Sequence, residues 1–95
     1  MLICKDDIAL KCSELKERVS GDIRTIKFSI FDNIPQHKLI KMFEDTTFYF
    51  YDDILGGRLI ETNDTKIVGL RITYNADSTC DIQIKLTRKD VFYED

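Results

Sequence analysis

The amino-acid sequence predicts a single α+β domain over residues 1–95, in which an antiparallel β-meander of four to five strands carries one or two short helices on one face. Residues 66–88 alternate apolar and polar side chains on both sides of a turn at 75–78, which is typical of a β-hairpin with one buried face. Residues 46–52 and 58–62 flank a loop with two glycines and indicate a second hairpin.

Residues 6–20 are open to two interpretations. Apolar side chains recur at helical spacing from Ile8 to Val19, which favours a helix. The alternative is a strand, because Ile8, Leu10 and Cys12 also alternate with polar residues. The segment ends in a Ser-Gly-Asp sequence, which suits either the end of a helix or a tight turn.

A strand and a short helix are predicted next. The strand covers residues 23–31, and its inward side chains are Ile26, Phe28 and Ile30. Asp32-Asn33 offers a helix cap and Pro35 suits the first helical position, so a helix is expected over residues 35–44. The buried side of that helix is predicted to consist of Leu39, Ile40 and Phe43.

The final hairpin is predicted to have one buried and one solvated face. The buried face should hold Val68, Leu70, Ile72, Tyr74, Cys80, Ile82, Ile84 and Leu86. The opposite face should hold Arg71, Thr73, Asp81, Gln83, Lys85 and Thr87. Because those charges have both signs, the second face is interpreted as an ordinary solvated surface with local pairing across the strands.

The charge balance is mildly acidic. The chain has 17 acidic and 14 basic residues, a net charge of −3, and no run of like charge longer than two acids. A basic stripe of the kind that binds DNA or RNA is not evident along the chain, so no nucleic-acid partner is expected. Such a composition suits a soluble protein that contacts other proteins.

The cysteines and the apolar segments bear on the compartment. Three cysteines without a Cys-x-x-Cys pair do not suggest a disulfide framework or a zinc site. No apolar run has the length of a signal peptide core or a membrane span. We therefore expect a cytoplasmic protein without a membrane partner, located in the host cytoplasm or in the virion if it is encoded by a phage.

No pattern of residues points to catalysis. His37 is the only histidine and lies beside Gln36 and Lys38, where a solvated surface side chain is expected rather than a general base. The carboxylates fall in turns without the spacing of a calcium loop, and Gly56-Gly57 lacks the context of a phosphate-binding loop. We expect no catalytic residue, no metal and no cofactor, and therefore no enzyme.

Aromatic residues are the best candidates for a contact surface. In the run from Phe48 to Tyr51, alternation places Tyr49 and Tyr51 on the face opposite the two phenylalanines. These tyrosines are either covered by another element or form a protein contact, since tyrosine is enriched in interfaces. Phe92 and Tyr93, near the C-terminal end, are likewise expected either to pack on the domain or to contact a partner.

The leading hypothesis is a non-enzymatic protein-interaction module that joins an assembly of its own copies or of neighbouring proteins by adding strands along its sheet edges. A short helix, an aromatic strand, a Gly-containing hairpin and a final alternating hairpin make the chain similar to small phage tail and virion accessory domains. That resemblance implies a phage-type structural or accessory protein and transfers no functional residue.

Two other hypotheses remain. The first is a small acidic inhibitor of a host system, such as an anti-CRISPR or other anti-defence protein, which occupies a basic protein surface. Its acidic face would form where hairpin ends bring together Asp52, Asp53, Asp64 and Asp77. The second is a small enzyme with a carboxylate pair in a pocket, which is the least favoured because a domain of this size has little volume for one.

Overall fold

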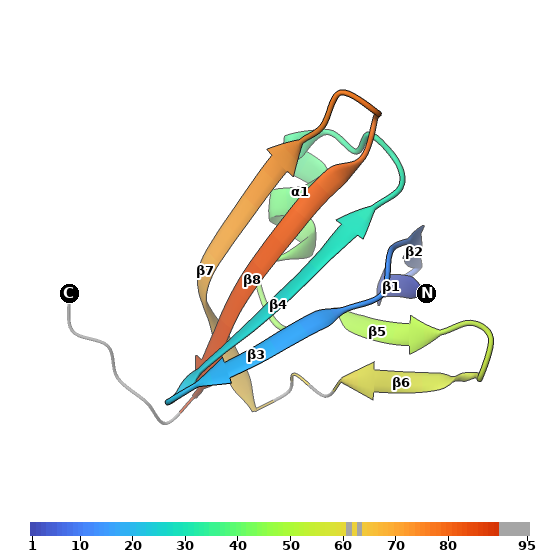
Figure 1. Ribbon diagram of the computed structural model, residues 1–95. Helices are drawn as coiled ribbons and strands as arrows, with labels where there is room; N and C mark the ends of the chain where they lie inside the picture. Colours follow the sequence, from blue (N-terminus) through green and yellow to red (C-terminus); the bar gives the residue numbers. More distant parts are fainter. Residues whose placement is uncertain (61, 63, 90–95) are drawn as a thin grey trace.

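The computed structural model describes residues 1–60, 62 and 64–89, and within them the chain forms eight strands and one helix. Sheet A has the order β2-β1-β5-β6, with bounds Ile8–Lys11, Leu2–Lys5, Tyr49–Asp52 and Gly57–Ile60. Sheet B has the order β3-β4-β8-β7, with bounds Lys16–Ser20, Ile23–Ile30, Cys80–Arg88 and Thr65–Tyr74. The helix α1 covers Gln36–Met42 and lies behind sheet B in Figure 1.

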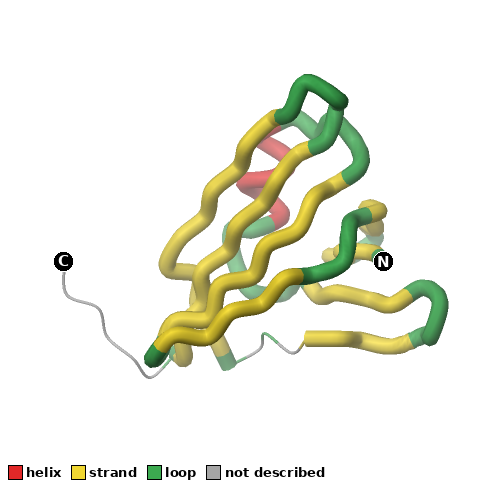
Figure 2. Tube along the Cα trace, in the orientation of Figure 1, coloured by secondary structure: helices red, strands yellow, loops and turns green. Residues whose placement is uncertain are grey.

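The predicted α+β class is confirmed in its coarse form, with antiparallel sheet and a helix, but the predicted single meander of four to five strands is wrong. The strands divide into two sheets of four, and every pairing is antiparallel. The β5–β6 hairpin pairs with β1, where Tyr51 lies opposite Leu2. The β7–β8 hairpin pairs instead with β4, where Ile82 lies opposite Phe28. Consecutive hairpins therefore belong to different sheets (Figure 2).

The favoured helix over residues 6–20 is wrong, and the strand alternative is correct. A tight turn with Asp6 at a φ of 54° joins β1 to β2, and Gly21 with a φ of +59° lies in the turn between β3 and β4. Ile8 and Val19, which suggested a helical stripe, are half exposed or more. Pairing with neighbouring strands outweighed this short periodicity, because strand preference depends strongly on tertiary context.

Residues 11–13 join the two sheets. The backbone N–H of Cys12 donates to Met1 O, while the N–H of Phe31 donates to Lys11 O and that of Ser13 to Ser29 O. The chain thus pairs with β1 on one side and with the end of β4 on the other. This corner holds the start of β3 beside β4 in sheet B.

The core lies between the inner faces of the two sheets and α1. The predicted inward residues of β4 and β8 are all buried: Ile26, Phe28, Ile30, Cys80, Ile82, Ile84 and Leu86. Phe28 packs edge-on against Phe50 of β5 with ring centres 5.1 Å apart, and Phe43 packs against Phe48 at 5.3 Å. Aromatic contacts therefore connect sheet A, sheet B and the segment after α1.

The prediction for β7 is only partly correct, because the strand contains a bulge between Ile67 and Gly69. Before the bulge Ile67 lies opposite Leu86, and after it Leu70 lies opposite Ile84. Val68, predicted to be buried, is the extra residue and is 41% exposed. Leu70 and Tyr74 were also predicted to be buried, but they are 36% and 43% exposed because β7 is an edge strand. A bulge adds one residue and shifts the alternation, which a regular strand pattern cannot show.

The helix differs from its prediction in two respects. Leu39 and Phe43 are buried as expected, but Ile40 is half exposed and Met42 takes its place in the core. Pro35 is the N-cap, and no side chain of the predicted Asp32-Asn33 cap bonds to the helix. The other end is capped by a residue that the sequence did not indicate, since buried Lys5 donates through Nζ to Lys41 O at 2.9 Å.

Candidate functional site: the basic outer face of sheet B

The outer face of sheet B gathers cations from all four of its strands. Because side chains alternate along a strand, the residues between the buried ones point away from the core. In β3, β4, β7 and β8 these residues include five exposed cations: Lys16, Arg18, Lys27, Arg71 and Lys85. We call this set the basic face.

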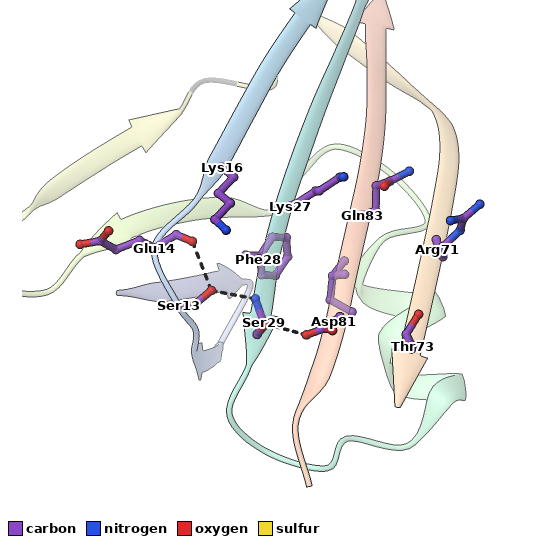
Figure 3. Close-up of a pocket in the computed structure, with 11 residues that line it drawn as sticks. Ser13, Glu14, Lys16, Lys27, Phe28, Ser29, Arg71, Thr73, Asp81 and Gln83 are labelled. Atoms are coloured by element: carbon purple, nitrogen blue, oxygen red, sulfur yellow. Dashed lines mark hydrogen bonds between the residues drawn. The ribbon is translucent and has the colours of Figure 1, made fainter. Parts of the chain in front are cut away.

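The first row of the basic face crosses the whole sheet. Lys16 lies opposite Lys27, Lys27 opposite Gln83, and Gln83 opposite Arg71. Figure 3 shows these four side chains in sequence across β3, β4, β8 and β7. With neighbouring strands about 4.8 Å apart, the row brings three cations within a width of roughly 15 Å.

The second row lies two residues further along the strands. Arg18 is opposite Thr25, Thr25 is opposite Lys85, and Lys85 is opposite Gly69. A Cβ atom at Gly69 would lie 3.4 Å from Lys85 Cβ, so the absence of a side chain there leaves room for the stem of Lys85. Rows two residues apart are separated by roughly 6.6 Å, so the five charges share a small area.

Two adjoining hollows follow these rows. The larger has a volume of about 670 Å³ and lies along the first row, extending to Ser13 and Thr73. The smaller has a volume of about 380 Å³ and lies along the second row, and the two share Lys16, Lys27 and Gln83. Most of the residues along them are polar and lie on an open sheet, which suits a macromolecular surface or an extended segment better than an enclosed small molecule.

One end of the larger hollow carries acid and hydroxyl groups. Ser29 donates through Oγ to an Asp81 carboxylate oxygen at 2.6 Å, and Asp81 lies between Ser29 and Thr73 in the strand register. Glu14 lines the same hollow beside Ser13. The acids therefore mark a rim at this end, and the cations fill the rest of the face.

The charge on the basic face is locally uncompensated. Within the described part of the chain, none of its five cations forms a salt bridge, whereas Arg24 pairs with Glu17 at 2.9 Å and Arg88 with Asp22 at 3.4 Å. Removing these five charges from the net charge of −3 leaves −8 for the rest of the sequence. Like charges directly opposite on neighbouring strands are destabilising, as for Lys16 and Lys27.

The four aspartates that were predicted to converge lie at three separate places in the chain. Asp52 ends β5 and Asp53 begins the turn to β6, whereas Asp64 precedes β7 and Asp77 follows it. Ten residues of β7 separate the last two, which corresponds to roughly 33 Å of extended strand. The structure therefore does not bring the four together on one acidic face.

Three of these aspartates have contacts typical of turns. Asp52 accepts hydrogen bonds from the backbone N–H groups of Ile54 and Leu55. The amino group of Met1 lies 2.9 Å from Asp53, and this hydrogen bond is the main reason why the pKa of Asp53 is lowered. The N–H and hydroxyl of Thr79 donate to Asp77 and lower its pKa in the same way.

The aromatic candidates have different outcomes. Tyr49 and Tyr51 are half-buried on β5, so their face is neither fully covered nor an open patch. Their role as a contact surface stays a prediction. Phe92 and Tyr93 lie outside the described residues.

Other predicted features are placed as follows. His37 is exposed in the first turn of α1. The three cysteines are free and buried, and burial raises the pKa of Cys12 to about 11. The described residues contain no group of three or more His, Cys, Asp or Glu side chains placed to hold a metal ion, and no helix among them is long and apolar enough to span a membrane.

The basic face was missed because its parts were interpreted separately. Arg71, Gln83 and Lys85 were assigned to the outer face of the hairpin, but β4 and β3 complete that face with Lys27, Lys16 and Arg18. Because residues 6–20 were expected to form a helix, Lys16 and Arg18 were not expected on this sheet. One outer-face residue was also misplaced, since Thr87 is buried and donates to Asp22 O at 2.8 Å.

The comparisons with protein-family models, with curated proteins and with solved structures found no match. The candidate site therefore rests on its geometry and charge.

Proposed function

We propose that this chain is a non-enzymatic protein-interaction module that binds an acidic protein surface through the basic face. The observation that carries the proposal is the first row, in which Lys16, Lys27 and Arg71 lie on one side of a single sheet without salt bridges among the described residues. An arrangement that opposes folding through like-charge repulsion is typical of a functional surface. An acidic partner would relieve this repulsion on binding.

The chemistry of the face favours a protein over a nucleic acid. The described outer-face residues are mostly basic or polar, and they include no aromatic side chain on which a base could stack. Asp81 and Glu14 at the rim would repel phosphates but could pair with basic residues of a partner protein.

Neither the acidic-inhibitor hypothesis nor the assembly hypothesis named the basic face as the binding surface. The acidic-inhibitor hypothesis required four aspartates on one face, and these lie at three separate places. The assembly hypothesis is compatible with a basic face if a neighbouring subunit supplies the acids. A phage-type structural or accessory role remains a prediction.

The proposal is tested with a fluorescently labelled oligo-glutamate and an oligothymidylate of equal length, whose binding is followed by anisotropy over a range of salt concentrations. We expect the oligo-glutamate to bind at low salt and to dissociate as salt rises. The triple variant K27Q/R71Q/K85Q should bind it roughly tenfold more weakly, since each exposed charge contact contributes about 0.2–1 kcal/mol.

A matched control removes three exposed lysines from other parts of the molecule. The variant K11Q/K38Q/K41Q has the same net charge as the test variant but leaves the basic face intact. It should bind the oligo-glutamate much as the wild type does. Equal losses in the two variants, or tighter binding of the oligothymidylate, would show that the proposal is wrong.

A further inference from the structure

Strand β7 forms one edge of sheet B. Beyond the bulge, the N–H and C=O groups of alternate residues point away from the sheet. It is the last strand in the order β3-β4-β8-β7, and among the described residues it pairs only with β8. The N–H of Asn75 donates to Thr79 O, and this bond fixes which residues of β7 form hydrogen bonds with β8, since every second residue does so. That alternation directs the N–H and C=O groups of Leu70, Ile72 and Tyr74 away from β8.

The side chains of the same residues form an apolar margin on the inner side of the edge. Leu70, Ile72 and Tyr74 lie opposite Ile84, Ile82 and Cys80, on the core side of the sheet. Leu70 is 36% exposed and Tyr74 is 43% exposed, so the core face continues to the edge without being fully covered. Tyr74 is held there by its hydroxyl, which donates to Ile34 O at 2.8 Å.

The outer side of the same edge is basic. Arg71 follows Leu70 on the opposite face, and Lys85 lies beside Gly69 on the neighbouring strand. A strand placed next to β7 would thus meet apolar side chains on one face and cations on the other. Its own side chains would have to alternate in the same manner.

We infer that the partner contributes an extended segment of alternating acidic and apolar residues, which adds to sheet B as a fifth, antiparallel strand beside residues 69–74. The inference rests on the proposed function and names the form of its partner. Main-chain hydrogen bonds to Leu70, Ile72 and Tyr74 would align the segment. Its acidic side chains would then lie beside Arg71 at the end of the first row of the basic face.

The opposite edge of sheet B provides an internal control. Strand β3 also has cations on its outer side, but its inner side carries the Glu17–Arg24 ion pair and a single apolar residue, Val19, in place of three neighbouring apolar or aromatic side chains. An alternating segment should therefore prefer β7. A purely electrostatic ligand would not distinguish the two edges in this way.

The experiment uses a synthetic peptide of alternating valine and glutamate and a composition-matched peptide with the valines and glutamates in separate blocks. We expect the alternating peptide to bind more tightly and to slow amide hydrogen exchange at Leu70, Ile72 and Tyr74, but not at Glu17 or Val19. N-methylation of its valines, whose N–H groups would face β7, should weaken binding by roughly tenfold or more, whereas N-methylation of its glutamates should have little effect.

The outcomes separate this inference from the proposed function. If the basic-face variant K27Q/R71Q/K85Q binds more weakly but N-methylation at either set of residues makes no difference, strand addition is wrong and the proposed function stands. If neither the variant nor N-methylation weakens binding, both are wrong. Protection of the β3 amides in place of those of β7 would also overturn the inference.

Discussion

The two faces of sheet B are built from the same four strands and differ in almost every property. The inner face is aliphatic and aromatic, and residues such as Ile26 and Ile84 are completely buried. The outer face carries five cations without salt bridges among the described residues. The inner face stabilises the fold, whereas the outer face opposes it through charge repulsion. Stability and binding should therefore respond in opposite directions to substitutions on the outer face.

The largest expected effect comes from the inner face. Phe28→Ala removes a buried ring that packs edge-on against Phe43 and Phe50, so we expect the free energy of unfolding to fall by about 3–5 kcal/mol. The matched control is Phe31→Ala, three residues further along the chain, where the ring is 53% exposed. Chemical denaturation should show a loss of less than about 1 kcal/mol there. Similar losses in both variants would contradict the assignment of the core.

A smaller effect of opposite sign is expected on the outer face. Lys27→Glu places an acid directly opposite Lys16, so the free energy of unfolding should rise by about 0.2–1 kcal/mol at low salt. The gain should diminish as salt is added, and the affinity for oligo-glutamate should fall in the same variant. Thermal denaturation and anisotropy measure the two quantities on one sample.

The control for this prediction is the same change on sheet A. Lys11 lies near enough to Asp53 to contribute to its lowered pKa, so Lys11→Glu brings two acids together. That variant should be less stable than the wild type and should bind oligo-glutamate nearly as well. A gain in stability for Lys11→Glu, or a loss for Lys27→Glu, would mean that the basic face is not under repulsion.

The smallest effect concerns the turn that sets the register of β7 and β8. Asp77 accepts two hydrogen bonds from Thr79, which lower its pKa below the ordinary value of 3.8. Its ionised form is thus favoured by folding, and the contribution is present above that ordinary value and is lost as pH falls through the lowered pKa. Asp77→Ala should be slightly less stable at neutral pH, and thermal denaturation should show the difference vanishing in strong acid. A difference that persists at low pH would contradict this.

The parts of the fold that could be predicted from the sequence are those with long regular patterns. The inward residues of β4 and β8 follow strict alternation over residues 26–30 and 80–86, and all of those predicted are buried. The strands β1, β2 and β3 have only four or five residues each, too few to outweigh a chance helical spacing. The bulge in β7 adds one residue, and the local sequence pattern does not indicate it.

The candidate site was less predictable than the core for a physical reason. Buried residues reveal themselves through local periodicity, whereas the basic face depends on which strands become neighbours. Lys16 and Arg71 are separated by most of the chain and belong to one row only because β4 and β8 lie between them. The turn carboxylates are different, because Asp52 and Asp77 accept hydrogen bonds from residues only two positions away, and such local contacts can be expected from the sequence.

The central claim is that the basic face is the binding surface, and NMR mapping on the wild-type chain tests it most directly. Isotope-labelled protein is titrated with oligo-glutamate, and the chemical shifts of all backbone amides are followed. The account predicts the largest changes along the two rows, at Lys16, Lys27, Gln83, Arg71 and Lys85. Changes concentrated on sheet A or α1, or spread evenly over the exposed lysines, would contradict it.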